Sequence, residues 1–127
     1  MSVLYLDASA ITKLVVEEPE TQALRSRVEG ERLVTSRVAV VEVTKAASRA
    51  SASADAQPIL SRLAFVELDA ELARLAATTG GTSLRSLDAI HVASAVRLGP
   101  EVVAFVTYDE RQGAAAVAVG LPTEAPR

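Results

Sequence analysis

The sequence predicts an α/β fold: a three-layer α/β/α sandwich around a mainly parallel central sheet. Short apolar runs rich in β-branched residues, such as residues 3–6 and 102–108, alternate with segments whose apolar residues recur at helical spacing. Unbroken apolar runs of this kind are typical of strands that are buried on both faces. Strands that alternate with helices indicate a sheet covered by helices on both sides.

The composition excludes several kinds of protein. The chain has 127 residues, half of them apolar, so we expect a single domain over residues 1–127. It has no Cys and one His, His91, which excludes a thiol nucleophile and a structural zinc site. Any metal ion must therefore be bound by oxygen ligands, which favours magnesium or manganese.

The net charge and the hydropathy pattern indicate what the protein binds and where in the cell it lies. The net charge of −3 argues against a generally basic nucleic-acid binder, so a contact with RNA would need a local patch. No apolar run approaches the ~18 residues of a membrane span. The N-terminus lacks the basic-then-apolar pattern of a signal peptide. We therefore expect a cytoplasmic protein that makes no membrane contact.

The apolar pattern and the capping residues place the elements. Strands are predicted at residues 3–6, 33–35, 65–68, 102–108 and 119–121, the last as an edge strand. Helices are predicted at residues 10–17, 20–29, 37–50, 58–63, 71–79, 82–98 and 110–117. Ser36, Asp69 and Ser86 are the predicted N-caps of three of these helices. Residues from 122 onward are predicted to fray.

The helix at 82–98 is apolar around most of its surface, which is typical of a buried helix. Its first turn nevertheless carries Asp88, a charge that is costly to bury. The helix dipole favours an anion at this end, which would explain one isolated acid. That explanation weakens if other acids lie at the same place.

Three further acids are expected near Asp88, at the same edge of the sheet. In right-handed crossovers, the carboxyl ends of the strands and the amino ends of the helices share one edge of the sheet. Asp7 follows the first strand and Asp109 follows the strand at 102–108, while Asp88 begins the helix between them. Glu42 lies near the start of its own helix. Carboxylates from four remote segments are therefore expected at one edge.

Four neighbouring carboxylates repel one another. At ~4 Å and an effective dielectric constant near 20, each pair costs about 4 kcal/mol. Divalent cations would relieve this repulsion, and magnesium prefers such oxygen ligands. Two such ions can activate a water and stabilise a leaving oxygen, so the site predicts phosphodiester hydrolysis.

Four segments together resemble the PIN-domain family, and more narrowly its VapC-type ribonuclease toxins. They are DASAITKLVVEE (residues 7–18), the isolated Glu in VAVVEVTKA (38–46), LRSLDAIHVASA (84–95) and VTYDERQ (106–112). The segments occur in the order of the family and span nearly the whole chain.

The resemblance implies a PIN-like fold and a set of site residues. It matches Asp7, Glu42, Asp88 and Asp109 to the acidic metal-binding quartet of the family, and Ser9 and Thr107 to supporting hydroxyls. It also implies an RNA substrate, a magnesium or manganese cofactor, a homodimer, and a small antitoxin that neutralises the toxin.

Simpler interpretations of these residues remain open. Ser9 is suited to satisfying a backbone N–H at a helix start, and Thr107 to an ordinary strand position. Glu42 lies three residues before Lys45, the spacing of a surface ion pair. A lone His on an apolar helix is more often a hydrogen-bonded core residue than a catalytic one, so His91 is left out of the catalytic set.

Candidate contacts for RNA phosphates are cations close to the acids in sequence. Arg85 and Arg111 lie nearest, and Lys13 and Lys45 are further candidates; each is equally suited to a solvated surface position. In the resembled family, the first two helices help to form the antitoxin groove. Leu14, Val15, Leu24 and Val28 are the apolar side chains there, unless the core claims them.

Two other functions fit parts of the pattern. The first is a catalytically weak PIN-fold module that binds RNA or a partner protein. The second is a phosphoacceptor receiver domain, which is also small, α/β and acidic. A receiver would need a Lys after a later strand, and the segment after 102–108 offers Arg111 instead.

Overall fold

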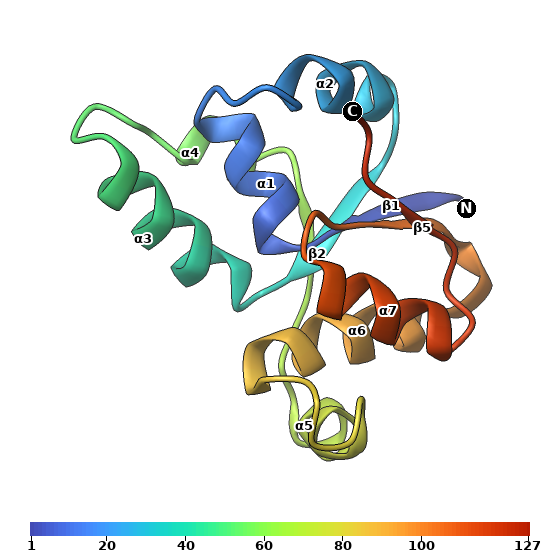
Figure 1. Cartoon of the computed structure of the whole chain (residues 1–127). Helices are drawn as coiled ribbons and strands as arrows, with labels where there is room; N and C mark the ends of the chain where they lie inside the picture. Colours follow the sequence, from blue (N-terminus) through green and yellow to red (C-terminus); the bar gives the residue numbers. More distant parts are fainter.

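The structure is a computed structural model that describes all residues, 1–127 (Figure 1). A five-stranded, fully parallel sheet runs through it in the order β3-β2-β1-β4-β5. The strands are β1 (Val3–Leu6), β2 (Leu33–Ser36), β3 (Ala64–Val66), β4 (Val102–Val106) and β5 (Thr123–Glu124). The α-helices are α1 (Ala8–Val15), α2 (Thr21–Val28), α3 (Ala39–Ala50), α4 (Gln57–Leu60), α5 (Ala70–Thr78), α6 (Ser86–Leu98) and α7 (Glu110–Ala118).

Helices cover both faces of the sheet, which confirms the predicted sandwich. Leu4 and Leu6 of β1 point into one core, which they share with α1, α2, α3 and α4. Tyr5, between them, points into the opposite core against α6 and α7. This alternation is the period of two that a strand imposes on its side chains. Helix α5 packs on the outside of α6 (Figure 1).

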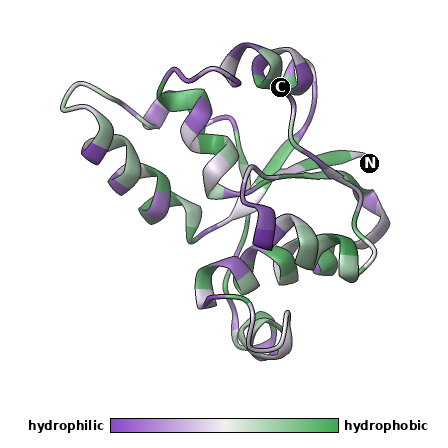
Figure 2. Cartoon of the chain, in the orientation of Figure 1, coloured by the Kyte–Doolittle hydropathy of each residue, from purple (hydrophilic) through white to green (hydrophobic).

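The outer helices have the amphipathic character that this layering requires. Along α3, Ala39, Val43 and Ala47 are buried, while Val41, Thr44 and Lys45 are exposed. Hydrophobic and hydrophilic segments alternate along the helix (Figure 2). Helix α6 is more deeply buried, but Leu87 and Val96 remain exposed, so it is not covered on every side as its sequence predicts. None of the helices combines the length and the hydrophobicity that a membrane span requires.

The C-terminal region corrects two predictions. Residues 119–121 are not a strand: Gly120 has φ of +87°, and the N–H of Leu121 donates to the carbonyl of Ala116, which closes the end of α7. The edge strand is β5, in the segment predicted to fray. The N–H of Thr107 donates to the carbonyl of Glu124 at 3.1 Å, so the tail completes the sheet.

Several boundaries also move by two to four residues. Helix α1 begins at Ala8 because Asp7 caps it. Helix α6 begins at Ser86 itself, whereas residues 82–85 form a turn and Arg85 takes the N-cap position without a side-chain bond. Strand β4 ends at Val106, so Thr107 lies just beyond the strand. The last shift matters for function, because it places Thr107 at the edge where the acids gather.

Candidate active site

Asp7 is the most deeply buried acid of the predicted set. It follows β1, and its Oδ1 accepts hydrogen bonds from the N–H of Ala10 at 2.9 Å and the hydroxyl of Ser9 at 2.6 Å. Its Oδ2 accepts from the hydroxyl of Thr107. Burial raises the pKa of Asp7 above its usual range, and the hydrogen bonds from Ser9 and Thr107 oppose that shift. The carboxylate is thus fixed between the ends of β1 and β4.

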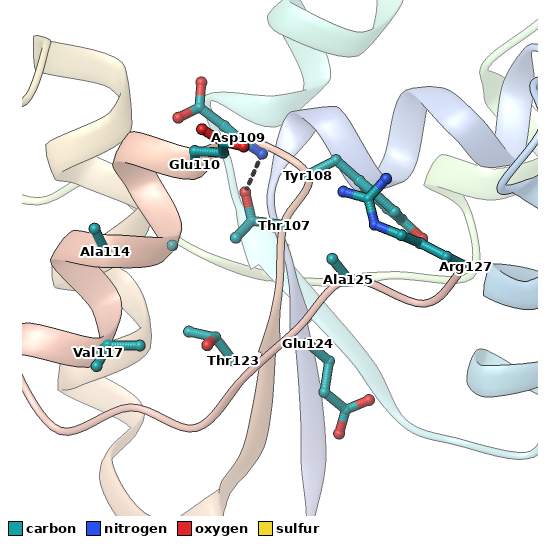
Figure 3. A pocket seen from close by; sticks show the side chains of 11 residues that line it. Thr107, Tyr108, Asp109, Glu110, Ala114, Val117, Thr123, Glu124, Ala125 and Arg127 are labelled. Carbon is teal, nitrogen blue, oxygen red and sulfur yellow. Dashed lines mark hydrogen bonds between the residues drawn. The ribbon is translucent and has the colours of Figure 1, made fainter.

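The hydroxyls of Ser9 and Thr107 connect Asp7 to the segment that follows β4. The Oγ of Ser9 accepts from the N–H of Tyr108 at 3.0 Å. The Oγ1 of Thr107 accepts from the N–H of Asp109 at 3.1 Å (Figure 3). Each hydroxyl therefore donates to Asp7 and accepts from the backbone beside Asp109, which sets the position of one acid relative to the other.

Asp109 and Asp88 are joined by one residue, Gln112, through its backbone and its side chain. Asp109 caps α7 by accepting from the backbone N–H of Gln112 at 2.9 Å. The side-chain amide of Gln112 donates to Oδ1 of Asp88 at 3.0 Å. Burial, followed by the charge of Asp109, raises the pKa of Asp88 above its usual range. The two carboxylates are therefore close enough to repel each other.

Glu42 reaches the same edge from the first turn of α3. Its Oε1 lies 2.7 Å from Nε2 of His91, and its side chain is 20% exposed. The charge of Glu42 also raises the pKa of Asp88, although less than Asp109 does. The ion pair with Lys45 that its spacing suggested is not formed. As the simpler interpretation of His91 expects, that residue is a buried core residue with hydrogen bonds at both ring nitrogens.

The four acids share one edge, but their side chains do not converge into a closed cage. No three His, Asp or Glu side chains lie close enough together to chelate a metal ion in this arrangement. The donor set is nevertheless suited to a hard divalent cation, because it consists of carboxylate oxygens. The raised pKa of Asp88, caused in part by Asp109 and Glu42, shows a concentration of negative charge that a cation would relieve.

The predicted cations lie in different places. Arg85 precedes α6, and its charge opposes the rise in the pKa of Asp88, so it lies near that acid. Arg111 instead lines a hollow beside residues 80–83. Lys13 is bound to Glu18 and Glu20 at 3.2 and 3.0 Å. Arg85 is therefore the predicted cation that acts on Asp88.

A groove of about 810 Å³ runs between α1 and α3 and opens onto the acidic edge. Ser9 and Glu42 lie in it. Its other lining residues combine cations with apolar groups, among them Lys13, Lys45, Arg49, Val38, Val41 and Leu87. The apolar residues that the sequence suggested for a groove serve another purpose: Leu24 and Val28 are in the core, and Leu14 and Val15 pack against it.

A smaller hollow of about 460 Å³ lies on the other side of the loop that carries Asp109 (Figure 3). The start of α7 and the C-terminal tail line it. Arg127 stacks over the ring of Tyr108, whose hydroxyl donates to the carbonyl of Pro126 at 2.8 Å. The tail thus packs against the residue that precedes Asp109.

Gln112 was not among the predicted site residues, although it is buried and bonded to two acids through its backbone and side chain. A signal was present in the sequence. Asp109 followed three residues later by Gln112 is a variant of the capping-box pattern, in which the third residue returns toward the helix start. In this chain the Gln side chain turns to Asp88 instead.

Comparison with known proteins gives the family. A PIN-domain family profile matches residues 4–118. The chain belongs to the PIN-domain family.

Within that family, the relatives found are VapC ribonucleases. Ribonuclease VapC47 of Mycobacterium tuberculosis (strain CDC 1551 / Oshkosh) is 38% identical over 131 residues, which span 97% of this chain and 96% of the relative. Ribonuclease VapC46 of M. tuberculosis (strain ATCC 25618 / H37Rv) is 39% identical over 129 residues, or 99% of each chain.

Solved structures show the same fold at lower identity. M. tuberculosis VapC20, a toxin that cleaves the sarcin–ricin loop, aligns with a TM-score of 0.74 at 14% identity and covers 98% of this chain and 99% of its own. VapBC2 of Rickettsia felis, bound to a DNA fragment from its promoter, aligns with a TM-score of 0.72 at 14% identity over the same shares. At this identity, the likeness concerns the fold alone.

Proposed function

We propose that this chain is a metal-dependent endoribonuclease that hydrolyses RNA phosphodiester bonds as the toxin of a toxin–antitoxin pair. Its relatives of about 38% identity over nearly the full length carry the name ribonuclease VapC, which supports both the activity and the toxin role. The observation that carries the proposal is the linkage of Asp7, Asp109 and Asp88 through Thr107 and Gln112 at one sheet edge.

We assign Asp7, Asp88 and Asp109 as ligands of Mg²⁺ or Mn²⁺, with Glu42 binding directly or through a water. When bound, such an ion supplies the positive charge that activates a water and stabilises the leaving oxygen. Ser9 and Thr107 hold both oxygens of Asp7 in place. Arg85, whose charge already acts on Asp88, is placed to attract an RNA phosphate.

The groove between α1 and α3 suits the proposed antitoxin. It combines cations with Val41, which is 60% exposed, so an amphipathic segment with acidic residues would satisfy both kinds of group. A homodimer and a cytoplasmic location complete the proposal; both follow from the family resemblance and the composition.

A second candidate function is a binding module with little or no catalysis. The spacing of the acids favours it, because no three of them are in chelating positions. The two candidates make opposite predictions for RNA cleavage by the purified protein.

The test is cleavage of RNA with Mg²⁺, with Mn²⁺ and with EDTA, for the wild type and for Asp7→Asn, Asp88→Asn and Asp109→Asn. Asp55→Asn is the matched control, because Asp55 lies in an exposed loop. We expect metal-dependent cleavage that each site variant loses and the control keeps, with circular dichroism unchanged. Full cleavage in EDTA or by Asp88→Asn contradicts the metal assignment, and no cleavage with either metal supports the binding module.

A further inference from the structure

A chain of three hydrogen-bonded side chains, the first two of them buried, leads from the core to the acidic edge. The hydroxyl of Tyr5 lies 2.8 Å from Nδ1 of His91, and Nε2 of His91 lies 2.7 Å from Oε1 of Glu42. Tyr5 is fully buried and His91 is 1% exposed. The three residues come from β1, α6 and α3, so the chain crosses from the centre of the sheet to a peripheral helix.

Packing fixes the plane of the His91 ring. Tyr5 stacks on Phe105 of β4, with ring centroids 5.1 Å apart and planes within 4°. The rings of Tyr5 and His91 meet edge to face, with centroids 5.8 Å apart and an angle of 79° between their planes. Because both ring nitrogens have partners and the ring is enclosed, a flip of the imidazole would break two hydrogen bonds.

The partners also define which nitrogen carries the proton. A phenol keeps its proton at neutral pH, since its usual pKa is about 10. The Tyr5 hydroxyl can therefore donate to Nδ1, whereas the Glu42 carboxylate can only accept. With Nδ1 as the acceptor, a neutral imidazole must carry its proton on Nε2 and donate it to Glu42.

We propose that Tyr5 and His91 are positioning residues that orient Glu42 toward the acidic edge, through donation from Tyr5 to Nδ1 and from Nε2–H to Oε1. This assignment deepens the proposed function and rests on it for its catalytic meaning. The bond to His91 occupies Oε1, and Oε2 has no hydrogen-bond partner within the chain, so it is available to a water or an ion in the groove. Without His91, the carboxylate would be free to turn away along the groove.

The arrangement resembles the way outer partners orient ligands in metal sites, where their loss typically weakens metal affinity by about 10–100-fold. His91 also lies within electrostatic range of Asp7 and Asp88, so it is near more than one of the acids although it lies beneath the surface.

The first experiment reads the proton position directly. Because His91 is the only His in the chain, a long-range ¹H–¹⁵N spectrum of the labelled, metal-free protein shows a single imidazole. We expect the pattern of the neutral Nε2–H tautomer. The Nδ1–H tautomer, an imidazolium or rapid averaging between tautomers overturns the assigned direction of donation.

Two tyrosine variants test the hydrogen bond from Tyr5 to Nδ1. Tyr5→Phe keeps the ring stack and removes the donor to Nδ1, so we expect the Nδ1 resonance of His91 to shift while Glu42 still holds the proton on Nε2. Tyr108→Phe is the matched control, because it also removes one hydroxyl bond, to Pro126, but lies outside the chain of contacts. Its His91 spectrum should be unchanged. An unchanged spectrum in Tyr5→Phe overturns the role of Tyr5.

A second experiment measures positioning through Mn²⁺ affinity by calorimetry. His91→Gln retains an amide N–H that can reach Glu42, whereas His91→Leu has none. We expect about 10–100-fold weaker binding in the Leu variant and partial rescue in the Gln variant. Equal affinities in the wild type and both variants overturn the proposal. The tautomer experiment is independent of metal and RNA, so it remains decisive even if the ribonuclease assignment fails.

Discussion

Gln112 donates its side-chain amide to Asp88 at 3.0 Å, joining α7 to α6 where two acids meet. Its backbone N–H donates to Asp109 at 2.9 Å, so one residue contacts both carboxylates. The remaining atom of the amide, Oε1, is buried without a partner. An unsatisfied buried acceptor is costly, and in this place it is suited to a water held at the acidic edge.

Replacement of Gln112 by Met should weaken the site without unfolding the protein. Met has a similar shape but cannot donate to Asp88, which would then move more freely and repel Asp109 more strongly. We expect Mn²⁺ affinity to fall by about 10–100-fold, as for other partners that orient metal ligands. Calorimetric titration measures this. Gln22→Met, at an exposed position of α2, should bind as the wild type does; equal affinity in both variants would remove Gln112 from the site.

Asp7 and Asp69 provide a matched pair for pH dependence. Both cap a helix by accepting from the third N–H, but their pKa values move in opposite directions. Burial raises the pKa of Asp7 above 3.8, so ionisation destabilises the metal-free fold as pH rises through the range above that value. The hydrogen bond from Arg97 lowers the pKa of Asp69 to about 2, so its stabilisation is present above pH 3.8 and is lost as pH falls toward 2.

At neutral pH, without metal, we therefore expect Asp7→Asn to raise the melting temperature and Asp69→Asn to lower it. The difference for Asp7→Asn should shrink as pH falls toward 3.8, because Asp7 is then neutral in more of the chains. The difference for Asp69→Asn should persist down to about pH 3.8 and shrink only as pH falls further toward 2. Thermal unfolding in EDTA at several pH values measures both variants. A lower melting temperature for Asp7→Asn at neutral pH would show that its hydrogen bonds outweigh the cost of its buried charge.

The C-terminal tail should contribute measurably to stability. Deletion of residues 122–127 removes the backbone bonds of Phe105 and Thr107 to Pro122 and Glu124, at 2.7 and 3.1 Å. At about 0.5–1.5 kcal/mol each, we expect the free energy of unfolding to fall by about 1–3 kcal/mol in urea titrations. Removal of Arg127 alone should have little effect, because its side chain is 66% exposed and its ion pair with Glu20 is long, at 3.8 Å. Equal stability of the two truncated proteins would restore the prediction of a frayed tail.

The proposed role of the groove in antitoxin binding can be tested by adding a negative charge to it, because the antitoxin segment is proposed to be acidic. Val41→Asp places an anion among the groove residues at a position that is 60% exposed, so the fold should be retained. We expect affinity for the cognate antitoxin to fall by at least about tenfold, measured by calorimetry or by co-purification. Val117→Asp, which is 59% exposed on α7 and lies outside the groove, should bind normally. Equal binding by both variants would place the antitoxin elsewhere.

Much of the fold was predictable because it is encoded locally. The run at residues 3–6 became β1 with the same boundaries, since an unbroken apolar segment before Asp7 has few other structures available. The prediction of an edge strand at residues 119–121 was wrong because Val119 and Leu121 are as apolar as strand residues. Their structure was decided by Gly120 and by the end of α7.

The sequence by itself determined which elements form and, through the topology of parallel strands, that Asp7, Asp88 and Asp109 lie at one edge. Their role as metal ligands stays a prediction. Only the tertiary structure decided that Gln112 bonds to Asp88 and that His91 lies between Tyr5 and Glu42. The physical reason is separation along the sequence. Hydrophobic periodicity and helix caps act over a few residues. These hydrogen-bond partners are 24 to 86 residues apart and meet only when separate helices pack on the same sheet.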